Sequence, residues 1–71
     1  MLKLYQQRVA DEYDELWVRR LKLFAFLSTE MFKRLSLDEQ KRMTRQYAVM
    51  EEYETILKDR IAAFGLMGQD V

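Results

Sequence analysis

The hydrophobic residues in the first part of the chain recur every three or four positions. From about Lys3 to Leu27 no Pro or Gly interrupts this pattern, and the spacing predicts one long amphipathic helix. Tyr5 extends the apolar stripe toward the N-terminus, and Trp17 and Phe24 widen it. The stripe itself consists of Val9, Tyr13, Leu16, Leu23 and Leu27.

A short connector follows the first helix. Ser28-Thr29 breaks the periodic pattern, and residues 30–35 are expected to form a short helical turn that carries Met31 and Phe32. Ser36 and Glu39 then match a capping box, in which the two side chains satisfy exposed backbone N–H groups reciprocally. The connector therefore ends where another helix begins.

The last helix is expected to run from about Leu37 to Phe64. Gly65 fits the left-handed position that ends many helices, which leaves residues 65–71 as a flexible tail. The expected apolar face consists of Met43, Tyr47, Met50, Leu57, Ile61 and Phe64, with Tyr53 and Ile56 alongside.

Two long helices joined by a short connector predict an all-α antiparallel helical hairpin. The whole chain, residues 1–71, then forms one helical domain. Two helices of this kind leave apolar surface on the sides away from each other, so we expect the hairpin to oligomerise into a helical bundle. Candidates for the second apolar surface are Trp17, Leu21, Phe26, Tyr53 and Ile56.

The composition excludes several classes of function. The 71 residues contain no Cys and no His, so neither disulfides nor thiolate or imidazole metal sites are available. There is no glycine-rich phosphate loop, and we expect neither catalysis nor a cofactor.

A net charge of zero argues against a protein that coats polymeric nucleic acid. No apolar run approaches the roughly 20 residues of a membrane span, and the first residues do not resemble a signal peptide.

The zero net charge hides a separation of charge along the hairpin. Residues 19–45 hold eight basic and three acidic residues, a net charge of +5, and the rest of the chain holds four basic and nine acidic residues, −5. Residues 19–45 form the closed end of the hairpin and the two chain termini form the other. Opposite potentials orient association, so the pattern favours antiparallel pairing of subunits, unless these charges are only solvated surface.

Two arginines stand out at the acidic end. Folding the chain about residue 32 pairs positions whose numbers sum to roughly 64, which places Arg19 near Arg45 and brings Tyr5 and Arg8 close to Arg60 and Phe64. Two guanidinium groups beside an aromatic ring suit a phosphate-bearing ligand with a base that can stack. The alternative is simple pairing of these arginines with nearby acids.

Arg20 breaks the apolar stripe of the first helix. It lies between Leu16 and Leu23, where an apolar side chain is expected. Either its stem covers the core while the head reaches water, or the cation points into a cavity between subunits.

The chain resembles a family of small helical phage proteins related to a crAss-like phage open reading frame, which includes the anti-CBASS sponges for cyclic oligonucleotides. The resemblance covers about residues 5–64, and its most specific parts are Tyr5-Gln6-Gln7-Arg8-Val9 and Arg60-Ile61-Ala62-Ala63-Phe64. Further matching positions are Glu12, Glu15-Leu16, Lys22-Leu23, Phe26-Leu27, Phe32, Leu35, Glu39, Gln46, Met50, Tyr53, Leu57 and Asp59.

The resemblance implies a specific function. Characterised members of this family are non-catalytic homohexamers, built as trimers of dimers, that sequester the second messengers of bacterial CBASS immunity. Cyclic dinucleotides such as cyclic GMP–AMP lie in pockets between protomers, and cyclic trinucleotides occupy a separate site. The expected location is the cytoplasm of the infected host.

The family pattern also suggests site residues. Tyr5 is similar to the base-stacking aromatic, Arg8 to an arginine one turn later, and Arg60 to the C-terminal phosphate partner. The cation of the first helix matches Arg19 or Arg20 best, with Lys22 as a third candidate. Arg20-Leu21 departs from the pattern of many relatives, which have an apolar residue followed by a polar one.

Two other functions compete with this interpretation. The hairpin could be a structural adaptor that binds a protein through Trp17, Phe26 and Tyr53, since exposed aromatics often dominate protein interfaces. Alternatively, the basic end could bind DNA, with a steep dependence on salt.

Overall fold

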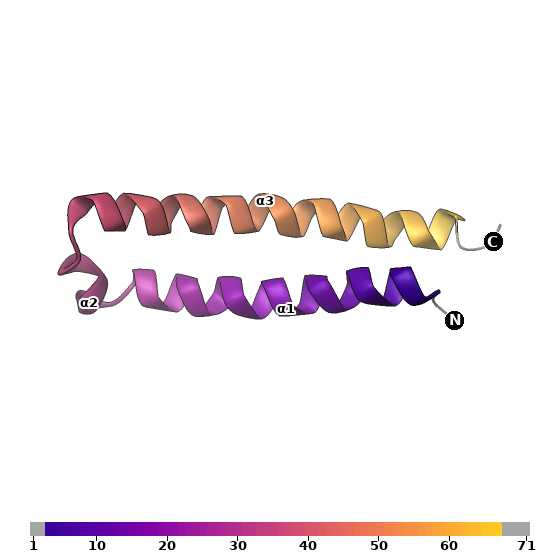
Figure 1. Cartoon of the computed structure of the whole chain (residues 1–71), viewed down its shortest axis with the longest axis horizontal. Helices are drawn as coiled ribbons and strands as arrows, with labels where there is room; N and C mark the ends of the chain where they lie inside the picture. Colours follow the sequence, from indigo (N-terminus) through magenta and orange to yellow (C-terminus); the bar gives the residue numbers. More distant parts are fainter. Residues whose placement is uncertain (1–2, 68–71) are drawn as a thin grey trace.

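The computed structural model describes residues 3–67, with side chains up to Phe64, and consists of three helices. Two long helices, α1 (Leu4–Leu27) and α3 (Leu37–Met67), lie side by side in opposite directions (Figure 1). The short helix α2 (Glu30–Lys33) joins them at one end. This arrangement confirms the predicted antiparallel hairpin, a rod of 52 × 15 × 14 Å.

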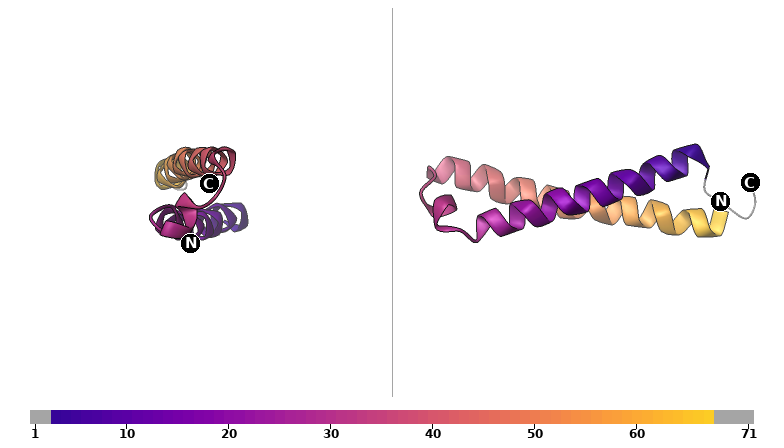
Figure 2. Two further views of the ribbon diagram at one scale, coloured as in Figure 1. Left: turned by 90° about the vertical axis from the view of Figure 1, so that its left-hand side faces the viewer. Right: turned by 90° about the horizontal axis from the view of Figure 1, so that it is seen from below.

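The two long helices meet along one regular seam. On each helix the seam residues alternate between spacings of three and four, the pattern that keeps a contact line between two supercoiled helices. The helices cross at a shallow angle (Figure 2), as this repeat predicts. The seam consists of Gln6, Val9, Tyr13, Leu16, Arg20, Leu23 and Leu27 on α1, and of Met43, Tyr47, Met50, Glu54, Leu57, Ile61 and Phe64 on α3.

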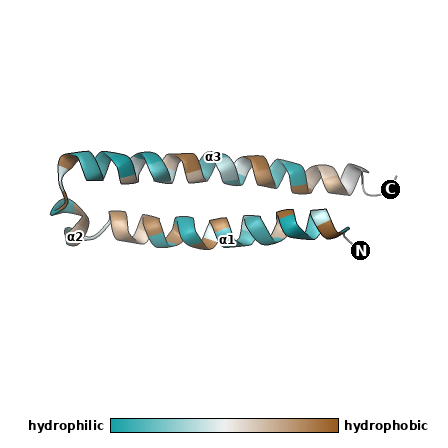
Figure 3. Cartoon of the chain, in the orientation of Figure 1, coloured by the Kyte–Doolittle hydropathy of each residue, from teal (hydrophilic) through white to brown (hydrophobic). Residues whose placement is uncertain are grey.

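Only a thin core separates the helices. Leu57 is completely buried and Val9 and Leu16 nearly so, whereas most other apolar side chains remain partly exposed. Apolar and polar segments alternate along the outside of both long helices (Figure 3). A single hairpin therefore leaves much apolar surface uncovered. Within residues 3–67, none of the helices is long and apolar enough to cross a membrane.

The connector fixes how far one helix is displaced along the other. Thr29 caps α2 by accepting the Phe32 N–H at 3.2 Å. The first turns of α3 extend beyond the end of α1 and lie over α2 (Figure 1), where Gln40 Nε2 donates to the Leu35 carbonyl at 2.8 Å. Because α3 covers α2 before it reaches α1, Phe24 packs against Tyr47. The expected pairing of Arg19 with Arg45 is therefore wrong.

The helix ends differ from the sequence prediction at two places. Ser36 Oγ accepts the Glu39 N–H at 3.2 Å, but the Glu39 carboxylate accepts from Arg42 Nε at 2.8 Å instead of completing the capping box. The last helix continues through Gly65 to Met67 rather than ending at Phe64. Residues 68–71 of the expected tail lie outside the described residues.

Most of the expected second apolar surface is exposed. Trp17, Leu21, Tyr53 and Ile56 are between 38% and 48% exposed. Phe26 differs, because it is half-buried with its ring centroid 6.2 Å from that of Phe32 in an edge-to-face contact. Phe26 thus holds α2 against α1.

Candidate functional site

The hairpin has two sides that differ in chemistry. Residues one position before a seam residue lie on one side of a helix, and those one position after it lie on the other. Because the helices run antiparallel, the preceding positions of both helices share one side of the hairpin, here called the pre-seam side. The following positions share the opposite, post-seam side.

Five of the six candidate ligand residues lie on the pre-seam side. Each directly precedes a seam residue, and all five are exposed. Only Arg20 occupies the seam itself. The structure therefore gathers most of the predicted site on one surface, although spread over its length. The five residues are Tyr5, Arg8, Arg19 and Lys22 from α1 and Arg60 from α3.

Tyr5 offers an aromatic face at the open end of the hairpin. Its ring meets that of Phe64 edge to face, with centroids 5.8 Å apart and an interplanar angle of 84°. The side chain is nevertheless 51% exposed. The contact with Phe64 fixes the orientation of the Tyr5 ring, and the exposed part of that ring leaves room for a stacked base. The expected proximity of Tyr5 and Phe64 is confirmed.

The first turn of α1 contains a buried amide beside Tyr5. Gln6 is 3% exposed, and its Oε1 accepts the Lys3 N–H at 2.8 Å. Its Nε2 has no hydrogen-bond partner within the described part of the chain. The bond to Lys3 fixes the start of α1, and with it the position of Tyr5.

Arg8 and Arg60 keep their guanidinium groups exposed. Within residues 3–67 neither forms an ion pair, so the expected alternative of pairing with nearby acids is not observed. Asp11, a possible partner of Arg8, accepts from Gln7 Nε2 at 3.0 Å. Both guanidinium groups can therefore present their forked donors to a phosphate.

Arg20 is engaged inside the hairpin. Its Nε donates to Glu54 Oε2, and its Nη1 donates to the Tyr47 hydroxyl at 3.2 Å. Its guanidinium carbon lies 5.8 Å from the centroid of the Tyr47 ring, within reach of a cation–π contact. The Glu54 hydrogen bond raises the pKa of Arg20 above its ordinary value.

The Arg20–Glu54 pair was not foreseen as a contact. Glu54 is only 8% exposed, and neither snorkelling nor a cavity between subunits describes an arginine that binds a carboxylate of its own chain. One signal was available. Glu54 continues the 3–4 spacing of the α3 seam between Met50 and Leu57, so each helix has one charged seam residue, and the two have opposite sign.

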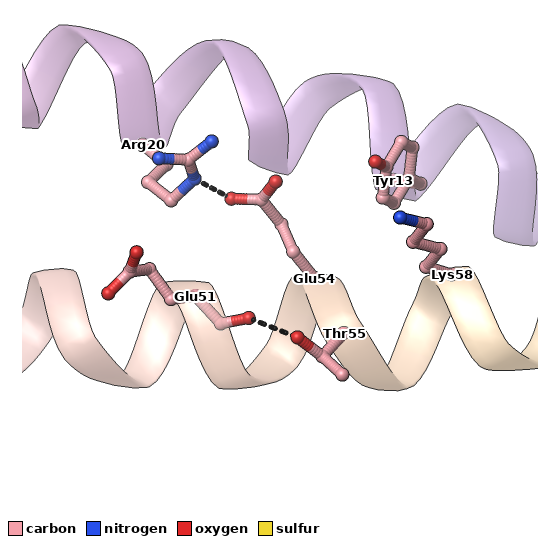
Figure 4. Close-up of a pocket in the computed structure, with 6 residues that line it drawn as sticks. All are labelled: Tyr13, Arg20, Glu51, Glu54, Thr55 and Lys58. Carbon is pink, nitrogen blue, oxygen red and sulfur yellow. Dashed lines mark hydrogen bonds and ion pairs between the residues drawn. The ribbon is translucent and has the colours of Figure 1, made fainter.

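A polar hollow lies beside this pair on the post-seam side (Figure 4). It has a volume of about 240 Å³. Lys58 reaches from α3 toward the Tyr13 ring, and Glu51 lies near the other end. Basic and acidic groups balance here, so the hollow shows no preference for an anion. Within residues 3–67 no cluster of acidic residues could hold a metal ion. The lining residues are Tyr13, Arg20, Glu51, Glu54, Thr55 and Lys58.

Comparison with known proteins gives two matches. A family model described as Sequestin matches residues 3–63. The chain is also 38% identical over 60 residues to an uncharacterised 7.5 kDa protein of the denB–rIIB intergenic region of Enterobacteria phage T4. That alignment covers 84% of this chain and 94% of the phage protein. No solved structure matches the chain.

Proposed function

The chain belongs to the Sequestin family, and from this premise we propose that it is a phage-encoded sponge for cyclic oligonucleotide second messengers. It binds cyclic dinucleotides such as cyclic GMP–AMP, and also cyclic trinucleotides, without turnover. By holding these messengers it inhibits bacterial CBASS immunity in the host cytoplasm. The family name denotes sequestration, and the match to a phage T4 protein agrees with a phage origin.

One structural observation supports this proposal above the others. A half-exposed aromatic ring and two exposed guanidinium groups lie on the same side of the hairpin, on Tyr5, Arg8 and Arg60. A nucleotide needs a surface on which its base can stack and charge-assisted donors for its phosphates. These three side chains provide both.

The first-helix cation of the proposed site must come from another protomer. Arg20 is bound to Glu54, which leaves Arg19 and Lys22 as candidates. Along a helix that rises 1.5 Å per residue, Arg19 lies roughly 21 Å from Tyr5. One compact ligand cannot bridge that distance within one chain. We therefore propose that the sponge works as a homo-oligomer, a hexamer built as a trimer of dimers, and that the exposed apolar surfaces hold it together.

Replacing Tyr5 tests the stacking role. Tyr5→Ala is expected to weaken binding of cyclic GMP–AMP by about 1–3 kcal/mol, the range found for stacking of one base on an aromatic side chain. Tyr5→Phe keeps the ring and should bind nearly as well as the wild type. Isothermal titration calorimetry with cyclic GMP–AMP and cyclic tri-AMP measures both variants. If Tyr5→Ala dissociates the oligomer instead, Tyr5 is a contact between subunits and not a ligand residue.

A further inference from the structure

The seam between the long helices contains one charged layer near its middle. Each helix has a single charged seam residue, Arg20 on α1 and Glu54 on α3. The two side chains are 18% and 10% exposed, and they form an ion pair (Figure 4). A buried ion pair adds little stability compared with apolar residues of similar size. A polar residue at one seam position can instead specify the register of two helices.

The apolar part of the seam tolerates more than one register. Because the spacing of three and four recurs at every turn, sliding α1 along α3 by one turn, about 5.4 Å, brings seam residues against neighbouring seam residues. Leu16 would then meet Met50 in one direction and Leu57 in the other, and both contacts are apolar. The connector opposes such a slide through α2, but α2 has only four residues, and its capping bond to Thr29 is exposed. A second restraint in the seam therefore adds to the connector.

Arg20 is held from both sides along α3. The two aromatic contacts between α1 and α3 place Arg20 at the level of Met50. Tyr47 precedes this level by three residues and Glu54 follows it by four. Arg20 Nη1 donates to the Tyr47 hydroxyl at 3.2 Å, and its Nε donates to the Glu54 carboxylate. A slide of one turn separates Arg20 from Glu54 in one direction and from Tyr47 in the other.

We infer that Arg20, Tyr47 and Glu54 form a register clamp, which restricts α1 and α3 to one displacement and thereby holds Arg60 at the level of Arg8. The clamp is specific because each slide breaks one of its two contacts and leaves a charged group in the seam without a partner. That loss is far costlier than the exchange of one apolar contact for another.

The register determines how the two exposed arginines lie relative to each other. The same aromatic contacts place Arg60 at the level of Val9, one residue beyond Arg8. A slide of one turn would move Arg60 by about 5 Å along the hairpin, farther than a hydrogen bond can adapt. Arg20 is thus a positioning residue that acts on the ligand only through Arg60. This consequence rests on the proposed function, whereas the clamp itself does not.

Distances between two labels measure the register without any ligand. The chain contains no Cys, so Asp11→Cys on α1 and Arg45→Cys on α3 introduce two unique sites for nitroxide labels. Both positions are exposed and differ in level by roughly 20 Å, so a slide changes the distance between the labels. Pulsed double electron–electron resonance reads this distance within one hairpin when labelled chains are diluted in unlabelled ones. The wild type should give one narrow distance.

Two variants in the labelled chain release the clamp. Arg20→Met with Glu54→Leu makes the layer apolar and should add distances that differ from the wild-type distance by about 3–5 Å, the effect of a one-turn slide. Tyr47→Phe keeps the ion pair and the ring and removes only the hydroxyl. It frees one direction and should add longer distances only. The matched control, Met50→Leu, changes an apolar residue at the level of Arg20 and should keep the single distance. Circular dichroism verifies that each variant stays helical.

Calorimetric titration with cyclic GMP–AMP, on chains without labels, then tests the positioning role. The apolar double variant should bind at least about tenfold more weakly than the wild type, the effect of losing one charge-assisted hydrogen bond. Met50→Leu should bind as the wild type does.

The clamp is overturned if the double variant keeps the single wild-type distance. If the double variant does not fold, an unchanged distance in Tyr47→Phe overturns it instead. Additional distances together with wild-type affinity overturn the positioning role. A wild type that binds no cyclic nucleotide contradicts the proposed function, and the label distances still decide whether the clamp exists.

Discussion

Replacing Arg20 by methionine is expected to destabilise the hairpin strongly, because it leaves the largely buried Glu54 carboxylate without its partner. Glu54 is 8% exposed and its carboxylate accepts from Arg20 Nε. A domain of this size has a total stability of roughly 5 kcal/mol. The single variant should therefore be largely unfolded at low protein concentration, which urea denaturation followed by circular dichroism will show.

The double variant separates the ion pair from the packing of the helices. Arg20→Met with Glu54→Leu replaces the charged layer by an apolar one and should recover most or all of the lost stability. Arg45→Met is the matched control, since Arg45 is exposed and lies away from the seam, and should change stability by less than about 0.5 kcal/mol. A single Arg20→Met variant as stable as this control would contradict the role assigned to the pair.

The second large effect is expected on ligand affinity. Arg8→Ala and Arg60→Ala should each weaken binding of cyclic GMP–AMP by about 10- to 100-fold, which corresponds to loss of a charge-assisted hydrogen bond worth about 1.5–3 kcal/mol. Lysine at either position keeps the charge but not the forked donors, so Arg8→Lys and Arg60→Lys should recover only part of the affinity. Calorimetric titration measures all four variants.

The control for these variants is another exposed arginine. Arg45→Ala removes the same charge from the outer surface of α3 and should bind the ligand as tightly as the wild type. Arg8 and Arg60 are exposed as well, so replacing either should leave the helical content unchanged. Equal loss of affinity in Arg45→Ala would show that only net charge matters and would contradict a defined site at Arg8 and Arg60.

The fold could be predicted from the sequence because its determinants are local. The spacing of Val9, Tyr13 and Leu16 predicts the first helix, and Ser36 marks the start of the last one within a residue. The hairpin follows from two such helices and a short connector. These patterns depend on neighbours within one or two turns, which the sequence shows directly.

The displacement of one helix along the other could not be predicted in the same way. It depends on α2, which takes up the space beneath the first turns of α3. Folding the chain about residue 32 therefore paired the wrong residues and missed the contact between Arg20 and Glu54. The end of the last helix was also predicted wrongly. Gly65 is a residue type suited to a helix end, but here it lies within α3, which continues to Met67.

The residues of the candidate site could be predicted from their chemical type, but the surface that they share is seen only in the structure. Tyr5, Arg8 and Arg60 were chosen as an aromatic ring with two guanidinium groups, and all three lie on the pre-seam side. The level of Arg60 relative to Tyr5 and Arg8 becomes visible only when the contacts Tyr5–Phe64 and Phe24–Tyr47 place the two helices in register.

Equilibrium dialysis tests sequestration most directly. The wild-type protein, in its assembled state, is dialysed against a panel of cyclic di- and trinucleotides that includes cyclic GMP–AMP and cyclic tri-AMP. The proposed function predicts that at least one of them accumulates on the protein side and is recovered intact after the protein is denatured. Equal concentrations on both sides for the whole panel, or recovery of a cleaved nucleotide, would contradict a non-catalytic sponge.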